Sequence, residues 1–142
     1  MKKLYVKSYA KINIALNIIG KREDGYHEVR MIMQTINMYD KLTMTLLDED
    51  KIVLTTNLSY LPNDENNLVY KAIKLIKDKH DIKTGVSVNL EKHIPVAAGL
   101  AGGSSDCAAA LVGMNKLFDL KLSQKTLHHI KFPFIMIKNN AI

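Results

Sequence analysis

Three segments of the chain alternate apolar and polar residues with a period of two, as half-buried β-strands do. These segments are Leu42–Leu46, Ile52–Thr55 and Val86–Glu91. β-Branched and aromatic residues are also frequent at 4–9 and 11–19, and a further extended segment at 29–38 follows a polar turn. The pattern predicts a mixed or antiparallel sheet.

A helical period replaces the alternation after residue 67. The apolar positions recur at i, i+4, i+7 and i+8, and they are Leu68, Ala72, Leu75 and Ile76. The residues predicted to face away are Lys71, Lys74, Lys77 and Asp78. Pro62 and a cluster of Asn and Asp precede this run and offer turn and N-cap chemistry. The segment is therefore predicted to be an amphipathic helix.

Two further elements are predicted in the second half of the chain. A helix is expected to open at Ser104 or Ser105 and to continue through residue 118, with Asp106 in its first turn, where a negative charge suits the helix dipole. Residues 122–130 are compatible with a short helix. The apolar run Phe132–Ile137 is predicted as a strand, whose edge would need a partner.

Composition favours a single small domain. A chain of 142 residues that is 47% hydrophobic can bury one core, with little left for a second. The net charge of +6 favours anionic partners such as nucleic acid, membrane surfaces or phosphorylated metabolites. Because the basic residues are dispersed and aromatic residues are few, we expect no nucleic-acid partner. The sequence does not predict an oligomeric state.

The sequence also favours a cytoplasmic protein. Cys107 is the single cysteine and cannot form an internal disulfide. Polar residues interrupt the apolar positions near the N-terminus, unlike the core of a signal peptide. No apolar run approaches the ~18 residues needed to span a bilayer, so we expect no membrane partner.

The most distinctive stretch is Pro95–Leu111, which places three glycines, two serines and an aspartate between runs of small apolar residues. A strand, a glycine-rich turn and a helix start bring free backbone N–H groups toward one point, where a phosphate can dock. The spacing matches neither the P-loop nor the dinucleotide fingerprint. On the glycines alone, a phosphate site and tight packing of a helix on a sheet are equally good interpretations.

Two strings decide between these interpretations by resemblance. The segment 95–105 reads Pro-x-x-x-Gly-Leu-x-Gly-Gly-Ser-Ser and resembles the signature motif of the GHMP kinases. The segment Ala10–Val29 resembles the N-terminal signature of one branch, the 4-diphosphocytidyl-2-C-methyl-D-erythritol kinases. The resemblance implies an α+β fold, the GHMP-kinase N-terminal domain, with a mixed or antiparallel sheet and helices packed on one face. It assigns residues 1–122 to this ATP-binding domain and leaves 123–142 as an atypical tail, with the second GHMP domain expected to be absent.

The resemblance also implies roles for individual residues. Lys11 matches the catalytic lysine, and Asn13, Tyr26 and His27 match substrate-binding positions, the latter two around the cytosine ring. Without the motif, Lys11 would be interpreted as a surface lysine, and Tyr26 and His27 as an ordinary turn. The positions that match the ATP site are Asn67, Leu68, Lys92, Pro95, Val96, Ala97, Ala98, Gly99, Leu100, Ala101, Gly102, Gly103, Ser104 and Ser105. Lys92 could otherwise be a charge at a strand end, and the sequence does not determine which serine meets the metal ion.

The implied activity is ATP- and Mg²⁺-dependent phosphorylation of the 2-hydroxyl of the cytidylated methylerythritol, a small-molecule substrate of non-mevalonate isoprenoid synthesis. The branch carries its catalytic aspartate in a Gly-x-Asp-Val-Pro-Phe segment, and Lys131 stands where that aspartate would fall. Asp106 is interpreted as a first-turn helix residue and not as the base. We therefore expect weak or no activity. The alternatives are a noncatalytic nucleotide-binding fragment and a GHMP kinase for another small alcohol.

Overall fold

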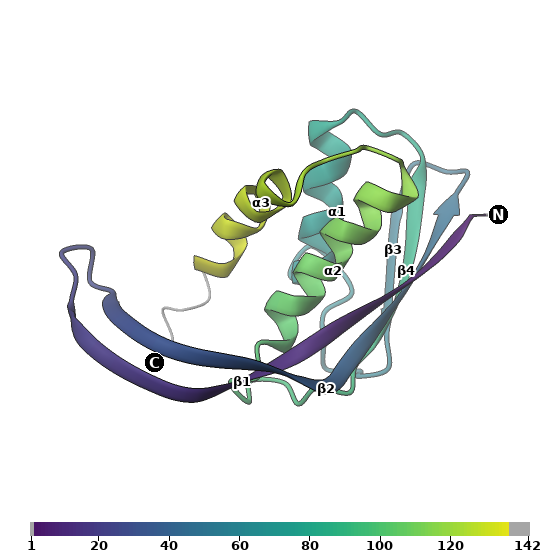
Figure 1. The fold of residues 1–142 in the computed structure, drawn as a ribbon. Coiled ribbons are helices and arrows are strands. Elements are labelled where there is room, and N and C mark those ends of the chain that lie inside the picture. The colour runs from purple at the N-terminus through teal and green to yellow at the C-terminus, as the bar shows by residue number, and fades with distance from the viewer. Residues whose placement is uncertain (1, 137–142) are drawn as a thin grey trace.

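The computed structural model describes residues 2–136. In this part of the chain, four strands form one sheet in the order β1-β2-β4-β3, and three helices lie together on one face of it (Figure 1). β1 pairs with β2 and β2 with β4 in antiparallel fashion, whereas β3 and β4 are parallel. The predicted α+β fold with a mixed sheet is confirmed.

The first two strands form a long hairpin. β1 spans Lys3–Lys21 and β2 spans His27–Leu47, and they are joined by the predicted polar turn. Only the near half of this hairpin lies against the helices, while the far half projects away from them (Figure 1). Ile18 and Ile19 in this far half are 64% and 50% exposed, so the arm carries large apolar side chains that no other described residue covers.

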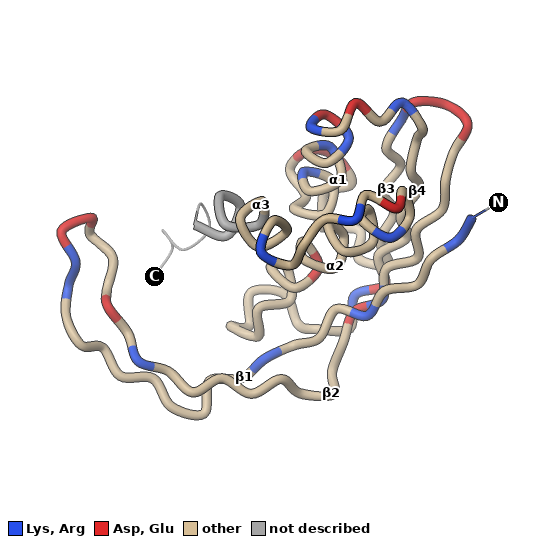
Figure 2. Tube along the Cα trace, turned by 45° about the horizontal axis from the view of Figure 1, so that its top comes forward, with Lys and Arg blue, Asp and Glu red and all other residues tan. Residues whose placement is uncertain are grey.

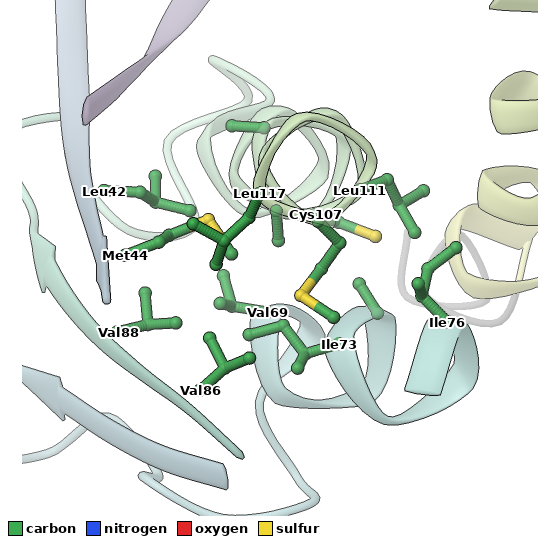
Figure 3. Packing of buried hydrophobic residues seen from close by; sticks show 14 of the residues in the cluster. Leu42, Met44, Val69, Ile73, Ile76, Val86, Val88, Cys107, Leu111 and Leu117 are labelled. Atoms are coloured by element: carbon green, nitrogen blue, oxygen red, sulfur yellow. The ribbon is translucent and has the colours of Figure 1, made fainter. Parts of the chain in front are cut away.

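The shorter strands complete the sheet beside the near half of the hairpin. β3 spans Ile52–Thr56 and β4 spans Gly85–Glu91. Val86, Val88 and Leu90 alternate toward the helices and are fully or almost fully buried. Figure 3 shows Val86 and Val88, together with Leu42 and Met44 of β2, facing the side chains of two helices. The period-two pattern therefore identified the core face of the sheet correctly.

The helix α1 spans Leu68–Lys79 and begins as predicted. The side chain of Asn67 accepts a hydrogen bond from the Val69 N–H at 2.9 Å and caps the helix. The prediction that Lys77 faces away is wrong, because this residue is only 8% exposed. Its ammonium group donates to Asp50 Oδ1 at 2.7 Å and to the Thr84 carbonyl oxygen at 2.6 Å, so the charge is paired where the helix end meets two loops.

The helix α2 spans Gly102–Leu117 and begins two residues earlier than the first predicted position. Its N-cap is Ala101, which has the left-handed φ of 61° and no capping side chain, so the polar Ser104 gave a misleading start signal. Asp106 is consequently beyond the first turn, and its side chain is buried, 2% exposed. The first-turn interpretation of Asp106 is therefore wrong.

The helix α3 spans Gln124–Met136, which overturns the predicted strand at 132–136. Leu127 and Ile130 are buried in the same core as α2, and the Ser123 hydroxyl accepts from the Thr126 N–H at 3.1 Å at the helix start. A helix satisfies its own backbone groups, so this apolar segment needs no neighbouring strand. Ile137, the last residue of the predicted strand, lies outside the described residues.

Charged residues of both signs are interspersed along the trace (Figure 2). This arrangement is as expected from the sequence, which has no basic run longer than two residues. Among the described helices, none has both the length and the apolar character needed to cross a membrane.

Candidate nucleotide site

The glycine-rich segment forms the loop between β4 and α2. It lies against the middle of β1, where the Lys11 N–H donates to the Leu100 carbonyl oxygen at 3.1 Å. Ala97, Gly99 and Ala101 all have left-handed backbone, with φ of 59°, 72° and 61°. Left-handed alanines cost of order 1 kcal/mol each, and such strain is often found at functional sites. The loop is therefore held in a shape that its own residues do not favour.

A pocket of about 540 Å³ opens over this loop. The predicted ATP-site residues from Pro95 to Ser104 all line it, together with Asn67, Leu68 and Lys92, whereas Ser105 does not. The structure thus gathers predicted positions as far apart in the sequence as Asn67 and Ser104 around one cavity. The lining also includes five residues that the sequence did not single out for this site: Leu61, Pro62, Asn66, Leu90 and Asp106.

Lys92 is buried at the floor of this region between two carboxylates. Its ammonium group forms ion pairs with Asp40 and with Asp106, the latter at 2.7 Å. All three side chains are at most 5% exposed. Lys92 is therefore more than a charge at a strand end, because its ammonium group is paired with two buried carboxylates.

The electrostatics of this triad follow from burial. Desolvation would lower the pKa of Lys92, but its hydrogen bonds and charge interactions with Asp106 and Asp40 outweigh that effect and raise the pKa above its ordinary value. Desolvation raises the pKa of Asp106 to about 6, in spite of the opposing effect of Lys92. Asp106 Oδ1 has no hydrogen-bond partner among the described residues, although the nearby Ser8 hydroxyl favours its charged form.

The substrate-side residues lie on the hairpin. Lys11 donates through Nζ to Asn13 Oδ1 at 3.1 Å, so the two side chains share one face of β1, as their spacing predicts. Tyr26 lies in the hairpin turn, and His27 begins β2. Lys11 and Lys21 are ten residue steps apart, which corresponds to roughly 33 Å of extended chain. The structure therefore brings Lys11 to the glycine loop but leaves Tyr26 and His27 at the far end of the arm.

A second hollow of about 480 Å³ lies at that turn and is lined by Gly20, Lys21, Arg22, Glu23, Asp24 and Glu28. Its charges are of both signs, and Arg22 already pairs with Asp24 at 2.8 Å. Neither Tyr26 nor His27 lines it. This hollow gives no independent support for a cytosine site.

The family model described as GHMP kinases N terminal domain matches residues 67–136, which include the loop, most of the pocket lining and the three described helices. The chain carries a GHMP kinase N-terminal domain. This GHMP domain resembles a crystal structure of 4-(cytidine 5'-diphospho)-2C-methyl-D-erythritol kinase with a TM-score of 0.75 and 29% identity, over 94% of this chain and 49% of that one. It also shares its fold with the Methanococcus jannaschii mevalonate kinase, with a TM-score of 0.69 at 19% identity.

Curated relatives of the GHMP domain are closer in sequence. A 4-diphosphocytidyl-2-C-methyl-D-erythritol kinase of Lachnospira eligens is 54% identical over all of this chain and 51% of its own length. One from Bacillus cytotoxicus is 55% identical over 88% of this chain and 43% of its own length. The chain therefore matches the N-terminal half of these kinases and spans about half of their length.

Proposed function

We propose that the chain forms the ATP-binding half of a 4-diphosphocytidyl-2-C-methyl-D-erythritol kinase. The whole enzyme would transfer a phosphoryl group from ATP to the 2-hydroxyl of the cytidylated methylerythritol. The observation that carries the proposal is the pocket over the glycine loop, because all the residues that match the family's ATP site except Ser105 surround one cavity beside Lys11. The names of the relatives at 54% and 55% identity supply the substrate.

The pocket fits a nucleotide triphosphate by its chemistry. From Pro95 to Gly103 the loop side chains are small or aliphatic, so the backbone is accessible to a ligand. At the start of α2 the first backbone N–H groups have no partner within the helix, and the helix dipole adds positive potential there. The Ser104 hydroxyl lines the same cavity and is a candidate ligand for phosphate or Mg²⁺. ATP would supply the phosphoryl group, and Mg²⁺ would neutralise part of its charge.

Lys11 is proposed as the catalytic cation. Its backbone N–H is hydrogen-bonded to the Leu100 carbonyl oxygen of the loop. Its ammonium group donates to Asn13 on the same face of β1, and this hydrogen bond is exposed. A cation in this place would stabilise charge that develops on the transferred phosphoryl group. Asn13 would orient both Lys11 and the acceptor alcohol. Tyr26 and His27 are proposed to contact the cytosine by stacking and hydrogen bonding, which requires the substrate to extend along the arm.

The chemistry of proton removal limits the activity expected of the 142-residue chain. Among the described residues that line the pocket, Asp106 is the only acid, and it is committed to Lys92. The 142-residue chain is therefore expected to bind nucleotide and to transfer phosphate slowly or not at all. If the reaction needed no general base from the protein, turnover in the ordinary kinase range of about 1–100 per second would be expected instead.

A single-turnover assay tests the proposal. Excess chain is mixed with labelled ATP, Mg²⁺ and the cytidylated methylerythritol, beside the Lys11→Ala variant. Slow transfer that Lys11→Ala abolishes supports the assigned site. Transfer to homoserine or mevalonate, without competition by cytidine diphosphate, would instead assign another GHMP specificity. Transfer that is unchanged in Lys11→Ala would contradict the role of Lys11.

A further inference from the structure

The chain leaves the sheet at the end of β4 and enters the glycine loop, and this exit lies next to Asp40 of β2. The ladder between β2 and β4 ends at the pair Lys41 and Glu91, so the next pair would be Asp40 and Lys92. At that position the side chain of Asp40 replaces the strand partner: its Oδ1 accepts from the His93 N–H at 2.5 Å and from the Ile94 N–H at 2.8 Å. The backbone N–H groups of His93 and Ile94 therefore share one carboxylate oxygen of Asp40 as their hydrogen-bond acceptor.

The other carboxylate oxygen of Asp40 pairs with the ammonium group of Lys92. That ammonium group also reaches Asp106 on α2, the helix that begins where the loop ends. The backbone of Lys92 is fixed separately, since its N–H donates to Asn57 Oδ1 at 2.7 Å and its carbonyl accepts from Asn57 Nδ2 at 3.0 Å. Lys92 therefore connects β2, the residues after β3, and α2.

Gly102 shows how closely the two ends of the loop approach each other. A Cβ atom on Gly102 would lie 3.2 Å from Lys92 Nζ and 3.0 Å from Ile94 Cγ2. Contacts of this length are tighter than normal packing, so the start of α2 rests directly on the residues that follow β4. The loop between them, with its three left-handed residues, is closed by this contact and by the ion pairs.

We propose that Asp40 is a positioning residue for nucleotide binding: it holds Lys92 and the amides of His93 and Ile94, and thereby fixes the glycine loop in its binding shape. Asp106 completes the arrangement at the other end of the loop through the same ammonium group. Asp40 is fully buried and does not line the pocket, so it acts only through these partners. The inference rests on the proposed function, because the ligand positioned is the nucleotide.

The chain offers a matched control for a test of Asp40. Asp50 also pairs with a buried lysine, Lys77, at 2.7 Å, but neither residue lines the pocket. Asp40→Asn keeps an oxygen that can accept from the two amides and removes the charge that holds Lys92. Asp50→Asn makes the same chemical change away from the loop. Both variants are measured well below their melting temperatures, with the full chain folded by circular dichroism.

Two measurements test the proposal, the affinity for Mg²⁺-ATP and the hydrogen exchange of the loop amides. The dissociation constant for Mg²⁺-ATP is expected to rise at least tenfold in Asp40→Asn and to change less than twofold in Asp50→Asn. Without nucleotide, hydrogen exchange of the amides at 93–104 is expected to accelerate at least tenfold in Asp40→Asn alone. Equal effects of the two variants, or wild-type exchange in Asp40→Asn, would overturn the inference. If the wild-type chain binds no ATP, the proposed function and the nucleotide role of Asp40 both fail, and the exchange data then show whether Asp40 still orders the loop.

Discussion

Lys92 Nζ lies 2.7 Å from Asp106 Oδ2 and pairs with Asp40 at the same time, so one buried ammonium group faces two buried carboxylates. Asp40 lies in β2, Lys92 directly follows β4 and Asp106 lies in α2, and two of the three, Lys92 and Asp106, line the pocket proposed to bind nucleotide. Removing one member of such a group is costly because it leaves the others buried and unpaired. The triad therefore supports the structure of the loop and also forms part of the floor of the pocket.

Lys92→Met is expected to lower the free energy of unfolding by about 3–5 kcal/mol at pH 8, because both carboxylates lose their cation. The measurement is urea denaturation followed by circular dichroism. Lys92→Met in an Asp40→Asn, Asp106→Asn background is the control, since the negative charges are then absent and most of the loss should be recovered. A loss below about 1 kcal/mol in the single variant would contradict a buried, paired lysine.

The raised pKa of Asp106 predicts that the stability of the folded chain depends on pH. Its pKa is raised to about 6 in the folded chain from an ordinary value of 3.8, so between these values the folded state holds a proton that the unfolded state has lost. The contribution of Asp106 to the free energy of unfolding therefore falls as the pH rises from about 4 to 6, by at most about 3 kcal/mol. Asp106→Asn lacks this dependence. Denaturation of both proteins at pH 4.5 and 7.5 should show the variant gaining stability relative to the wild type at the higher pH, and an unchanged difference would refute the raised pKa.

Two glycines are expected to respond differently to alanine. A Cβ on Gly103 has only Leu68 Cδ1 nearby, at 3.7 Å, but it would stand at the start of α2 on the pocket wall. Gly103→Ala should keep or raise stability by up to ~1 kcal/mol and weaken binding of Mg²⁺-ATP severalfold. A Cβ on Gly113 would come within 2.2 Å of Met44 Sδ in the core, so Gly113→Ala should cost about 1–3 kcal/mol.

Thermal denaturation and nucleotide titration of both glycine variants separate the two effects. Gly113→Ala should lower the melting temperature and bind nucleotide normally when folded. If Gly103→Ala bound Mg²⁺-ATP as the wild type does, the ligand would not occupy the start of α2.

The apolar arm is expected to contribute little to the stability of the 142-residue chain. Ile14 is 62% exposed and Ile32 is 61% exposed, so Ile14→Thr and Ile32→Thr should each change the free energy of unfolding by less than about 0.5 kcal/mol. Leu111→Ala, which opens a cavity in the core, should cost about 2–5 kcal/mol. Urea denaturation compares the three variants. A cost above 1 kcal/mol at Ile14 would show that its side chain is covered.

Much of the sheet was predictable because side-chain alternation and burial coincide in β3, β4 and the near half of β2. The start of α1 was also predictable, since Asn67 is a local cap. The burial of Lys77 was not, because it depends on Asp50, which lies 27 residues away. For the run at 132–136, apolar character alone does not distinguish a strand from a helix, and contacts of Leu127 and Ile130 with the core favour the helix.

The glycine loop was recognisable from its residues, but its support was not. Asp40 lies 52 positions before Lys92 and has no motif around it, so its role was invisible before β2 and β4 were paired. Asp106 carried a local signal that indicated the wrong role, since an acidic residue near a helix start usually faces solvent. Its burial follows from the close approach of α2 to Lys92.

Calorimetric titration of Mg²⁺-ATP into the folded 142-residue chain tests the nucleotide pocket most directly. We expect one saturable site with a dissociation constant below ~1 mM, in the range of ordinary KM values, and competition by ADP. Absence of saturable binding at millimolar ATP, in a chain that melts cooperatively, would contradict it.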